Sequence, residues 1–168
     1  MRKLFVAAIC LISSYLSAQT SPTLINDEKS STQILIGKCS RTDFSKVPYQ
    51  QDYDIEYKMY MLNDSTISVL KQKVGNVTLK IIMGCWCGDS KEQVPRFFKV
   101  LDNMKFDEIN VEIVCVDRDK KAEGNDLSSL NIEKVPTFII SRGGVEIGRI
   151  IETPQVSLEK DFLQIVLK

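Results

Sequence analysis

Apolar and polar positions along the second half of this chain follow the periods of strands and amphipathic helices. The mostly apolar run Val77 to Met83 predicts a strand. A helix with one buried face should follow it, because five apolar residues then recur at helical spacing: Val94, Phe97, Phe98, Leu101 and Met104. Val111 to Val116 is again almost continuously apolar, which is typical of a parallel strand covered on both faces.

The C-terminal third predicts a hairpin and a last helix. Thr137–Ile140 and Val145–Ile151 bracket Arg142-Gly143-Gly144, whose glycines suit the positive φ of a tight turn. Ser157 is a predicted N-cap for a helix that follows it, and residues 127–130 fit a short helix. Together these elements predict an α/β fold with a mixed four-stranded sheet flanked by helices on both faces.

The first 18 residues have the features of an export signal. Arg2 and Lys3 are basic, Leu4 to Leu16 is nearly all apolar, and Ser17-Ala18 supplies small residues for cleavage. The apolar stretch is shorter than the roughly 20 residues that a membrane span requires. We therefore expect an exported protein, periplasmic or extracellular after signal removal, without stable membrane insertion.

The rest of the chain divides into a leader, an extension and a main domain. Residues 19–33 are polar and lack periodicity, which predicts a flexible leader. Residues 34–76 carry a short apolar run and tyrosines at helical spacing, and Asn63 is a candidate cap for a second helix. This pattern predicts a largely helical extension packed on a main domain at residues 77–168.

Charge and composition exclude several classes of function. The chain has 22 basic and 22 acidic residues, and loss of Arg2 and Lys3 would leave 20 against 22. A nearly neutral protein suggests neither a nucleic-acid groove nor an anionic membrane surface as partner. The chain has no histidine, and its cysteines lack the paired spacing of structural zinc ligands. We predict no metal site and no cofactor.

The most informative segment lies where the predicted strand meets the predicted helix, at Cys85-Trp86-Cys87-Gly88-Asp89-Ser90. A helix N-terminus presents unpaired N–H groups and a partial positive charge, and both stabilise a thiolate over a thiol. Cys87 is therefore the candidate nucleophile.

Three motifs in order resemble the thioredoxin superfamily: Trp86-Cys87-Gly88, Pro95 within the helix, and Val135-Pro136-Thr137 before a strand. The resemblance covers Val77 to the C-terminus. It implies a Cys-x-x-Cys motif opening the first long helix and a cis-proline loop facing the reactive sulfur. Cys87 would match the attacking cysteine, and Ser90 takes the place of the resolving one. The buried acid that the family often carries would fall at Ile81.

A Cys-x-x-Ser site changes the expected chemistry, because a hydroxyl cannot form the second disulfide. Ser90 can still donate a hydrogen bond to a Cys87 thiolate. A mixed disulfide on Cys87 would then persist, be resolved by an external thiol, or be resolved by another cysteine of the chain.

The remaining cysteines leave alternatives open. Cys85 is the nearest resolving group, although two extended residues separate Cα atoms by about 6.6 Å, at the upper edge for a disulfide. Equally, Cys85 is a small residue that closes the strand. Cys39 could approach Cys87 only if the extension covered the site. Cys115 lies within an apolar strand and is expected to be an inert core thiol.

Residues around Cys87 are expected to face the substrate. Trp86 would shield one side of the sulfur, and Gly88 and Asp89 begin the helix. The negative charge of Asp89 would partly oppose thiolate stabilisation. Pro136, if cis as the resemblance implies, exposes the backbone of Val135 for strand-like pairing with a peptide.

Two functions follow from this sequence. The first is thiol–disulfide exchange on disulfide- or thiol-containing proteins through Cys87, with an external thiol reductant. The second is a non-catalytic binding module that uses the surface between Cys87 and Pro136 to hold a peptide or a partner protein.

Overall fold

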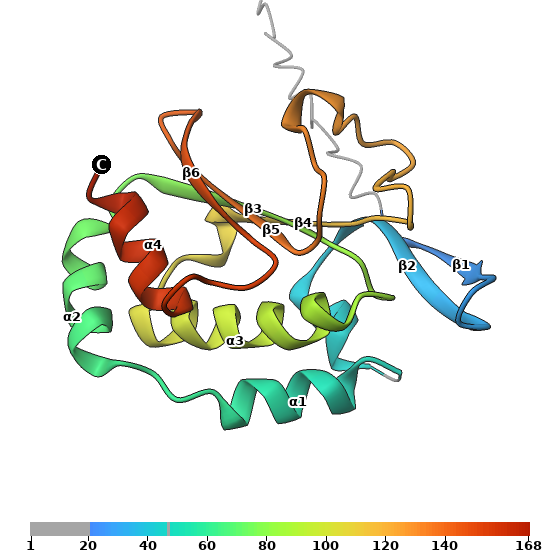
Figure 1. Ribbon diagram of the computed structural model, residues 1–168, viewed down its shortest axis with the longest axis horizontal. Helices are drawn as coiled ribbons and strands as arrows, with labels where there is room; N and C mark the ends of the chain where they lie inside the picture. The colour runs from blue at the N-terminus through green and yellow to red at the C-terminus, as the bar shows by residue number, and fades with distance from the viewer. Residues whose placement is uncertain (1–20, 47) are drawn as a thin grey trace, which may run out of the picture.

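The computed structural model describes residues 21–46 and 48–168, so the expected export signal at residues 1–18 lies outside the described residues. The described chain forms one six-stranded sheet with helices packed against it (Figure 1). Its elements, in chain order, are β1 (Thr23–Asp27), β2 (Thr32–Cys39), α1 (Gln50–Met59), α2 (Asp64–Lys73), β3 (Val77–Met83), α3 (Gly88–Met104), β4 (Val111–Cys115), β5 (Thr137–Arg142), β6 (Val145–Ile151) and α4 (Leu158–Val166). Short 3-10 turns lie at η1 (Arg41–Ser45), η2 (Glu108–Asn110) and η3 (Ser128–Leu130).

The sheet is mixed, as the sequence predicts. Strand order is β1-β2-β4-β3-β5-β6, with β3 parallel to β4 and every other neighbouring pair antiparallel. Because β3 and β4 are parallel, their C-terminal ends meet at one edge of the sheet, where the Cys85–Ser90 segment begins. The β3-to-α3 connection and the end of β4 are therefore neighbours in space.

The N-terminal segment adds β1 and β2 to the expected four-stranded sheet, and β2 contains the short apolar run at residues 34–36. β1 lies within the segment predicted to be a flexible leader, and it pairs with β2 from Thr23 opposite Ile36 to Asp27 opposite Thr32. Four of its five side chains are exposed, so backbone pairing holds the strand and the sequence lacks an alternating apolar signal. In Figure 1 the hairpin of β1 and β2 extends from one end of the sheet.

The helices lie on one side of the sheet in Figure 1, which differs from the expectation of helices on both faces. Between β4 and β5 the chain forms η3, a single 3-10 turn at the residues where the sequence predicts a short helix. This segment is rich in Asp, Lys, Gly and Asn and has no apolar stripe to bury. On the face away from the helices, Glu112 forms ion pairs with Lys80 at 3.1 Å and with Lys38 at 3.3 Å.

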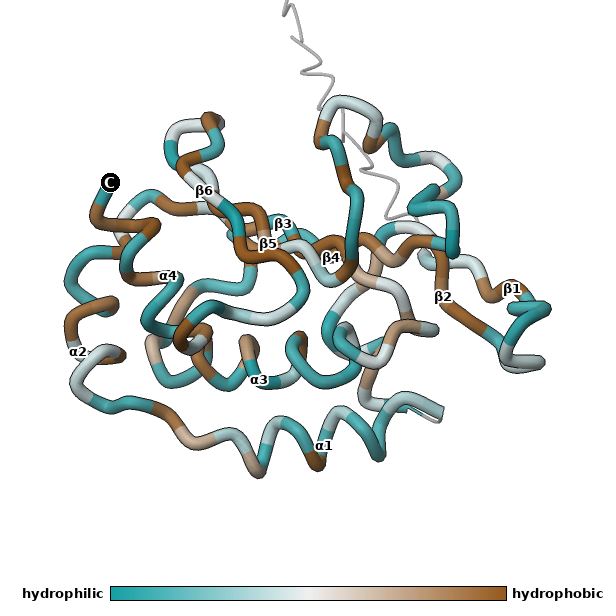
Figure 2. Tube along the Cα trace, viewed as in Figure 1, coloured by the Kyte–Doolittle hydropathy of each residue, from teal (hydrophilic) through white to brown (hydrophobic). Residues whose placement is uncertain are grey.

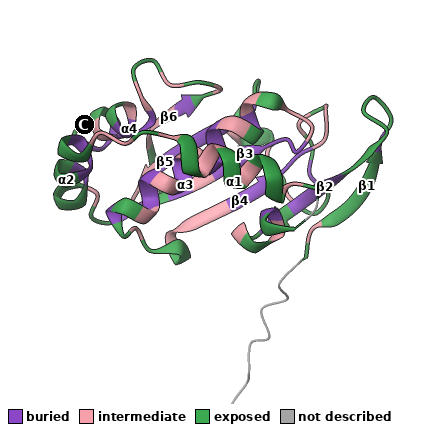
Figure 3. Cartoon of the chain, turned by 90° about the horizontal axis from the view of Figure 1, so that it is seen from below, coloured by how far each residue is buried: buried purple, intermediate pink, exposed green. Residues whose placement is uncertain are grey.

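The hydrophobic core lies between the sheet and α3. Phe97, Phe138 and Phe162 join α3, β5 and α4, with ring centroids 4.7 and 5.5 Å from that of Phe97. All three side chains are fully buried. The apolar positions run through the centre of the trace in Figure 2, and the central strands are largely buried in Figure 3. The predicted buried face of α3 is confirmed.

The extension is attached to α3 by a polar cluster. Arg41 donates to both carboxylate oxygens of Asp102, at 2.5 and 2.6 Å, and Tyr57 donates to the same carboxylate at 2.6 Å. The guanidinium carbon of Arg41 lies 4.8 Å from the centroid of Phe98. A bidentate arginine pair of this kind fixes orientation as well as distance, so α1 and η1 are held in register with α3.

Candidate functional site

Cys87 occupies the N-cap of α3, as the sequence predicts. Its backbone is extended, and its N–H donates to the Gly84 carbonyl at 2.9 Å, which closes the tight turn after β3. The Lys91 N–H then donates to the Cys87 carbonyl at 3.1 Å, the first hydrogen bond of the helix. Cys87 is partly exposed, whereas the other described cysteines are buried. The arrangement places a reachable sulfur at the N-terminus of a 17-residue helix.

The proline loop faces this sulfur. The peptide bond between Val135 and Pro136 is cis, and the Cys87 thiol donates to the Val135 carbonyl at 3.2 Å. The side chain of Val135 is buried, so only its backbone is directed at the thiol. Residues 48 positions apart thus meet, although the sequence linked them only through a family resemblance.

Trp86 is fixed beside Cys87 by a backbone hydrogen bond and a close contact. Its indole N–H donates to the Val116 carbonyl at 2.9 Å. The ring lies so near Gly84 that a Cβ at that position would be 2.6 Å from Trp86 Cε2. A glycine at position 84 therefore allows the indole to lie against the end of β3.

Ser90 is completely buried one helical turn after Cys87. Its hydroxyl oxygen accepts a hydrogen bond from the Gly84 N–H at 3.2 Å. The serine therefore ties the first turn of α3 to the end of β3. Donation of its proton to a Cys87 thiolate stays a prediction.

Arg118 and Asp27 belong to this site, and the sequence analysis missed both. The Arg118 guanidinium lies 4.9 Å from the Trp86 ring and donates to both oxygens of Asp27, at 2.7 and 2.8 Å. The hydrogen bond to Asp27 raises the pKa of Arg118, and the charge of Cys87 adds to this shift. The position of Arg118 could have indicated its role. It follows β4, and parallel strands bring their C-terminal ends together.

Other charges surround the proline loop. Lys134 pairs with Glu152 at 2.6 Å, which raises the pKa of Lys134, and Asp89 contributes to the same shift. The family position for a buried acid in β3 is occupied by Ile81, which is fully buried. Charged side chains therefore surround the site, and the strand beneath it is apolar at that position.

The other three cysteines of the described residues form a separate cluster, in which Cys39 and Cys85 each contact Cys115. Cys39 Sγ lies 3.0 Å from Cys115 Sγ, and Cys85 Sγ lies 3.8 Å from Cys115 Sγ. All four described cysteines are free thiols. The hydrogen bonds that Cys115 shares with the Cys39 and Cys85 thiols, together with burial, raise the pKa of Cys115 well above its ordinary value. The sequence analysis missed this cluster, because nothing in the sequence showed that β2 pairs with β4.

Residues 21–46 and 48–168 contain neither a metal-binding cluster nor a membrane-spanning helix. No group of three cysteine or carboxylate side chains there is arranged to hold a metal ion. No helix of this part of the chain is long and apolar enough to cross a bilayer.

Comparisons with known proteins give one family. A family model described as Thioredoxin matches residues 41–161, well over half of the chain. Thioredoxin H2-1 of Oryza sativa subsp. japonica is 35% identical over 75 residues, which is 45% of this chain and 50% of the relative. The chain thus spans about half the length of that relative.

Two solved structures resemble this chain. A protein of unknown function from Pseudomonas aeruginosa is similar with a TM-score of 0.54 and 16% identity, covering 79% of this chain and 88% of that one. Thioredoxin O2 from Arabidopsis thaliana, in its oxidized state, is 24% identical with a TM-score of 0.40, covering 60% and 84%. With the helix-capping cysteine, the cis-proline loop and the family match, the chain belongs to the thioredoxin family.

Proposed function

We propose that this protein exchanges thiols and disulfides with other proteins through Cys87 as its single nucleophile. One observation carries the proposal: the partly exposed Cys87 sulfur lies at the N-terminus of α3 and contacts the backbone of the cis-proline loop. Membership of the thioredoxin family supports the same chemistry. The Trp86-Cys87-Gly88-Asp89-Ser90 segment is the proposed reactive site.

In the first step, the Cys87 thiolate attacks one sulfur of a substrate disulfide. The substrate S–S bond breaks, a mixed disulfide forms on Cys87, and the other substrate sulfur leaves as a thiolate. The thiolate, not the thiol, is the form that attacks. The Val135 backbone and the Trp86 ring would contact the substrate peptide beside the sulfur.

Release of the product requires a second thiol from elsewhere. Ser90 has no sulfur, and the buried Cys85 contacts Cys115, not Cys87. An external thiol would therefore attack one sulfur of the mixed disulfide. Attack on the substrate sulfur forms a disulfide between the substrate and the external thiol and releases the Cys87 thiolate, whereas attack on the Cys87 sulfur forms a disulfide with Cys87 and releases the substrate thiolate. The reaction would depend on the concentration of that thiol.

The proposed setting is outside the cytoplasm, in the periplasm or the extracellular space. The apolar segment after Arg2 and Lys3 supports export, and disulfides persist in oxidising compartments. The partners would be proteins that carry disulfides or free thiols there. Detection of the protein without residues 1–18 in a periplasmic or culture fraction is expected; recovery only in the cytosol with that segment intact would contradict this part.

A trapping experiment tests the proposed function. Protein recovered from its own compartment is alkylated and run on non-reducing gels beside a Cys87→Ala variant and a matched Cys85→Ala variant. We expect higher-mass adducts in the wild type and in Cys85→Ala that dithiothreitol removes, and none in Cys87→Ala. If no adducts form and Cys85→Ala abolishes exchange, Cys85 resolves the disulfide and the single-cysteine mechanism is wrong. If folded protein binds partners non-covalently and unchanged in Cys87→Ala, it is a binding module.

A further inference from the structure

Three cysteines from separate parts of the chain meet beneath the site, and the sheet register explains why. Cys115 on β4 is the register partner of Gly37 on β2 and of Met83 on β3. Cys39 and Cys85 each follow two residues after these partners. Side chains two residues apart point to the same face of a strand, so Cys39 lies on the same face of the sheet as Cys115. Cys85 lies in the turn just after β3 ends, with its sulfur 3.8 Å from that of Cys115.

The sulfurs form a row with Cys115 in the middle. The Cys115 sulfur lies 3.0 Å from that of Cys39 and 3.8 Å from that of Cys85. A disulfide bond is about 2.05 Å long, so closure of the nearer pair requires an approach of about 1 Å. The side chains are only 8%, 3% and 0% exposed for Cys39, Cys85 and Cys115.

We propose that Cys39 and Cys115 form an internal disulfide, and that Cys85 is the thiol through which a small peroxide oxidises them. This buried centre is separate from Cys87. It does not depend on the exchange reaction proposed above, and it can be tested in protein that lacks Cys87.

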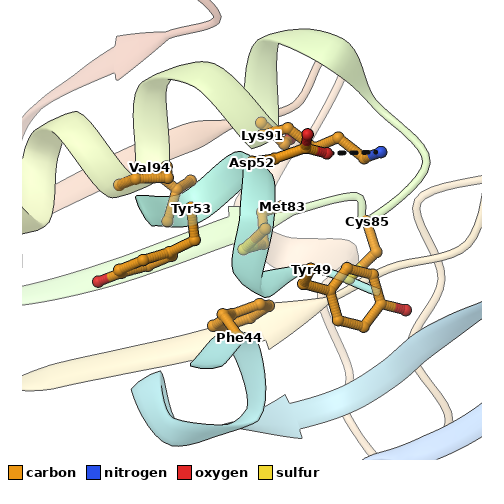
Figure 4. Close-up of a pocket in the computed structure, with 10 residues that line it drawn as sticks. Phe44, Tyr49, Asp52, Tyr53, Met83, Cys85, Lys91 and Val94 are labelled. Carbon is orange, nitrogen blue, oxygen red and sulfur yellow. Dashed lines mark ion pairs between the residues drawn. The ribbon is translucent and has the colours of Figure 1, made fainter. Parts of the chain in front are cut away.

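The cavity beside Cys85 supports its role as the point of entry. Figure 4 shows Cys85 directed toward the Tyr49 ring, with Phe44 and Tyr53 along the same cavity and an ion pair between Asp52 and Lys91 across it. The cavity measures about 20 Å³, enough for one water molecule or a peroxide of similar size.

The electrostatics favour the same order of reaction. The hydrogen bond shared with Cys115 lowers the pKa of Cys85, while the pKa of Cys115 is raised by its two thiol neighbours. Cys85 therefore ionises before Cys115, and the thiolate is the form that attacks a peroxide.

The chemistry balances with hydrogen peroxide as the oxidant. The Cys85 thiolate attacks one peroxide oxygen, the O–O bond breaks, and Cys85 sulfenic acid and hydroxide result. Cys115 then attacks the Cys85 sulfur and displaces water, which gives a disulfide between the two. Cys39 attacks the Cys115 sulfur, and Cys85 returns to a thiol as the second disulfide forms. Overall, two thiols and one peroxide become one disulfide and two waters.

The disulfide would join the N-terminal hairpin to the centre of the sheet. It would link β2 to β4, across 76 positions of chain. Val116, next to Cys115, accepts the hydrogen bond of Trp86, so the bond would fix the strand that positions the indole. Oxidation would therefore stabilise the hairpin and the surroundings of Cys87 together.

The test uses the full chain with Cys87→Ala, reduced and then exposed to hydrogen peroxide. We expect a mass loss of two hydrogens and a peptide cross-link that joins Cys39 to Cys115, with Cys85 open to alkylation after denaturation. The melting temperature of the oxidised protein should rise by about 5–15 °C over the reduced form, because the bond closes a long loop. An added Cys85→Ala should slow oxidation by about tenfold or more, and an added Cys115→Ala should prevent it.

Other outcomes would overturn the proposal. Alkylation of Cys39, Cys85 and Cys115 alike in peroxide-treated, folded Cys87→Ala protein would refute the disulfide. Equal oxidation rates with and without Cys85 would refute its role as entry thiol. Oxidised glutathione is too large for the cavity, so faster oxidation by it than by peroxide would also refute entry through the cavity. Because Cys87 is absent from every variant, a negative result in this test does not bear on the proposed exchange reaction. A negative result in the trapping experiment likewise does not bear on the internal disulfide.

Discussion

Replacement of Gly84 by alanine should displace the only tryptophan of the protein from beside the reactive cysteine. The new Cβ would lie 2.6 Å from Trp86 Cε2 and 2.8 Å from Nε1, so the indole must move. Movement would break its hydrogen bond to Val116, which measures 2.9 Å. Overpacking costs about 1–3 kcal/mol and a lost hydrogen bond about 0.5–1.5 kcal/mol. We therefore expect the free energy of unfolding to fall by about 2–4 kcal/mol.

The assay follows Trp86 fluorescence during urea unfolding, since the chain has one tryptophan. With a denaturant slope of about 2 kcal/mol per molar, the midpoint should fall by about 1–2 M. Native emission should shift to longer wavelength and become easier to quench with acrylamide. Gly88→Ala is the matched control, because a Cβ there meets nothing within 4 Å and alanine favours a helix. Unchanged emission and an unchanged midpoint in Gly84→Ala would refute the argument that Gly84 accommodates the indole.

Three further predictions concern the thiols and the acid range. Limiting iodoacetamide near neutral pH should label Cys87 before Cys115, which is 0% exposed and whose pKa is raised; peptide mapping that finds Cys115 labelled first would contradict the assignment. Ser90→Cys should create a dithiol one helical turn from Cys87 and raise insulin-disulfide reduction well above wild type, and no gain in a folded variant would show that the geometry is wrong for a second thiol. Burial opposes ionisation of Asp102, but hydrogen bonds from Arg41 and a tyrosine outweigh it and lower its pKa. This stability is present above about pH 4 and lost as the pH falls, so Asp102→Asn should unfold more easily at pH 7 and lose less stability between pH 7 and pH 3; an unaltered pH dependence would rule the pair out as a source of acid sensitivity.

Local patterns in the sequence predicted where Cys87 and two helix caps lie in the fold. A cysteine between an apolar run and an amphipathic segment is predicted to lie at a helix N-terminus. Cys87 is indeed the N-cap of α3. The cap residues Asn63 and Ser157 were found in the same way, because each accepts a hydrogen bond from a backbone N–H three residues later. Pro136 was expected to be cis through resemblance alone, and the structure confirms it.

Local sequence patterns could not predict which distant segments pair. β1 has mostly exposed side chains, so its place in the sheet depends on backbone hydrogen bonds to β2 and leaves no apolar period to detect. Without that hairpin, Asp27 could not be placed beside Arg118, nor Cys39 beside Cys115. Each of these contacts joins residues more than 70 positions apart in the chain.

The sequence by itself determined the candidate reactive group, since the identity of Cys87, its helix N-terminus and the serine at position 90 are all local properties. Tertiary structure alone decided the surroundings of that group. Sheet order placed β4 between β2 and β3, which brought Arg118 and the Val116 carbonyl to Trp86 and gathered three other sulfurs beneath them. The physical reason is that strand order depends on which faces and edges can be covered at once by the whole chain, a condition that no single segment encodes.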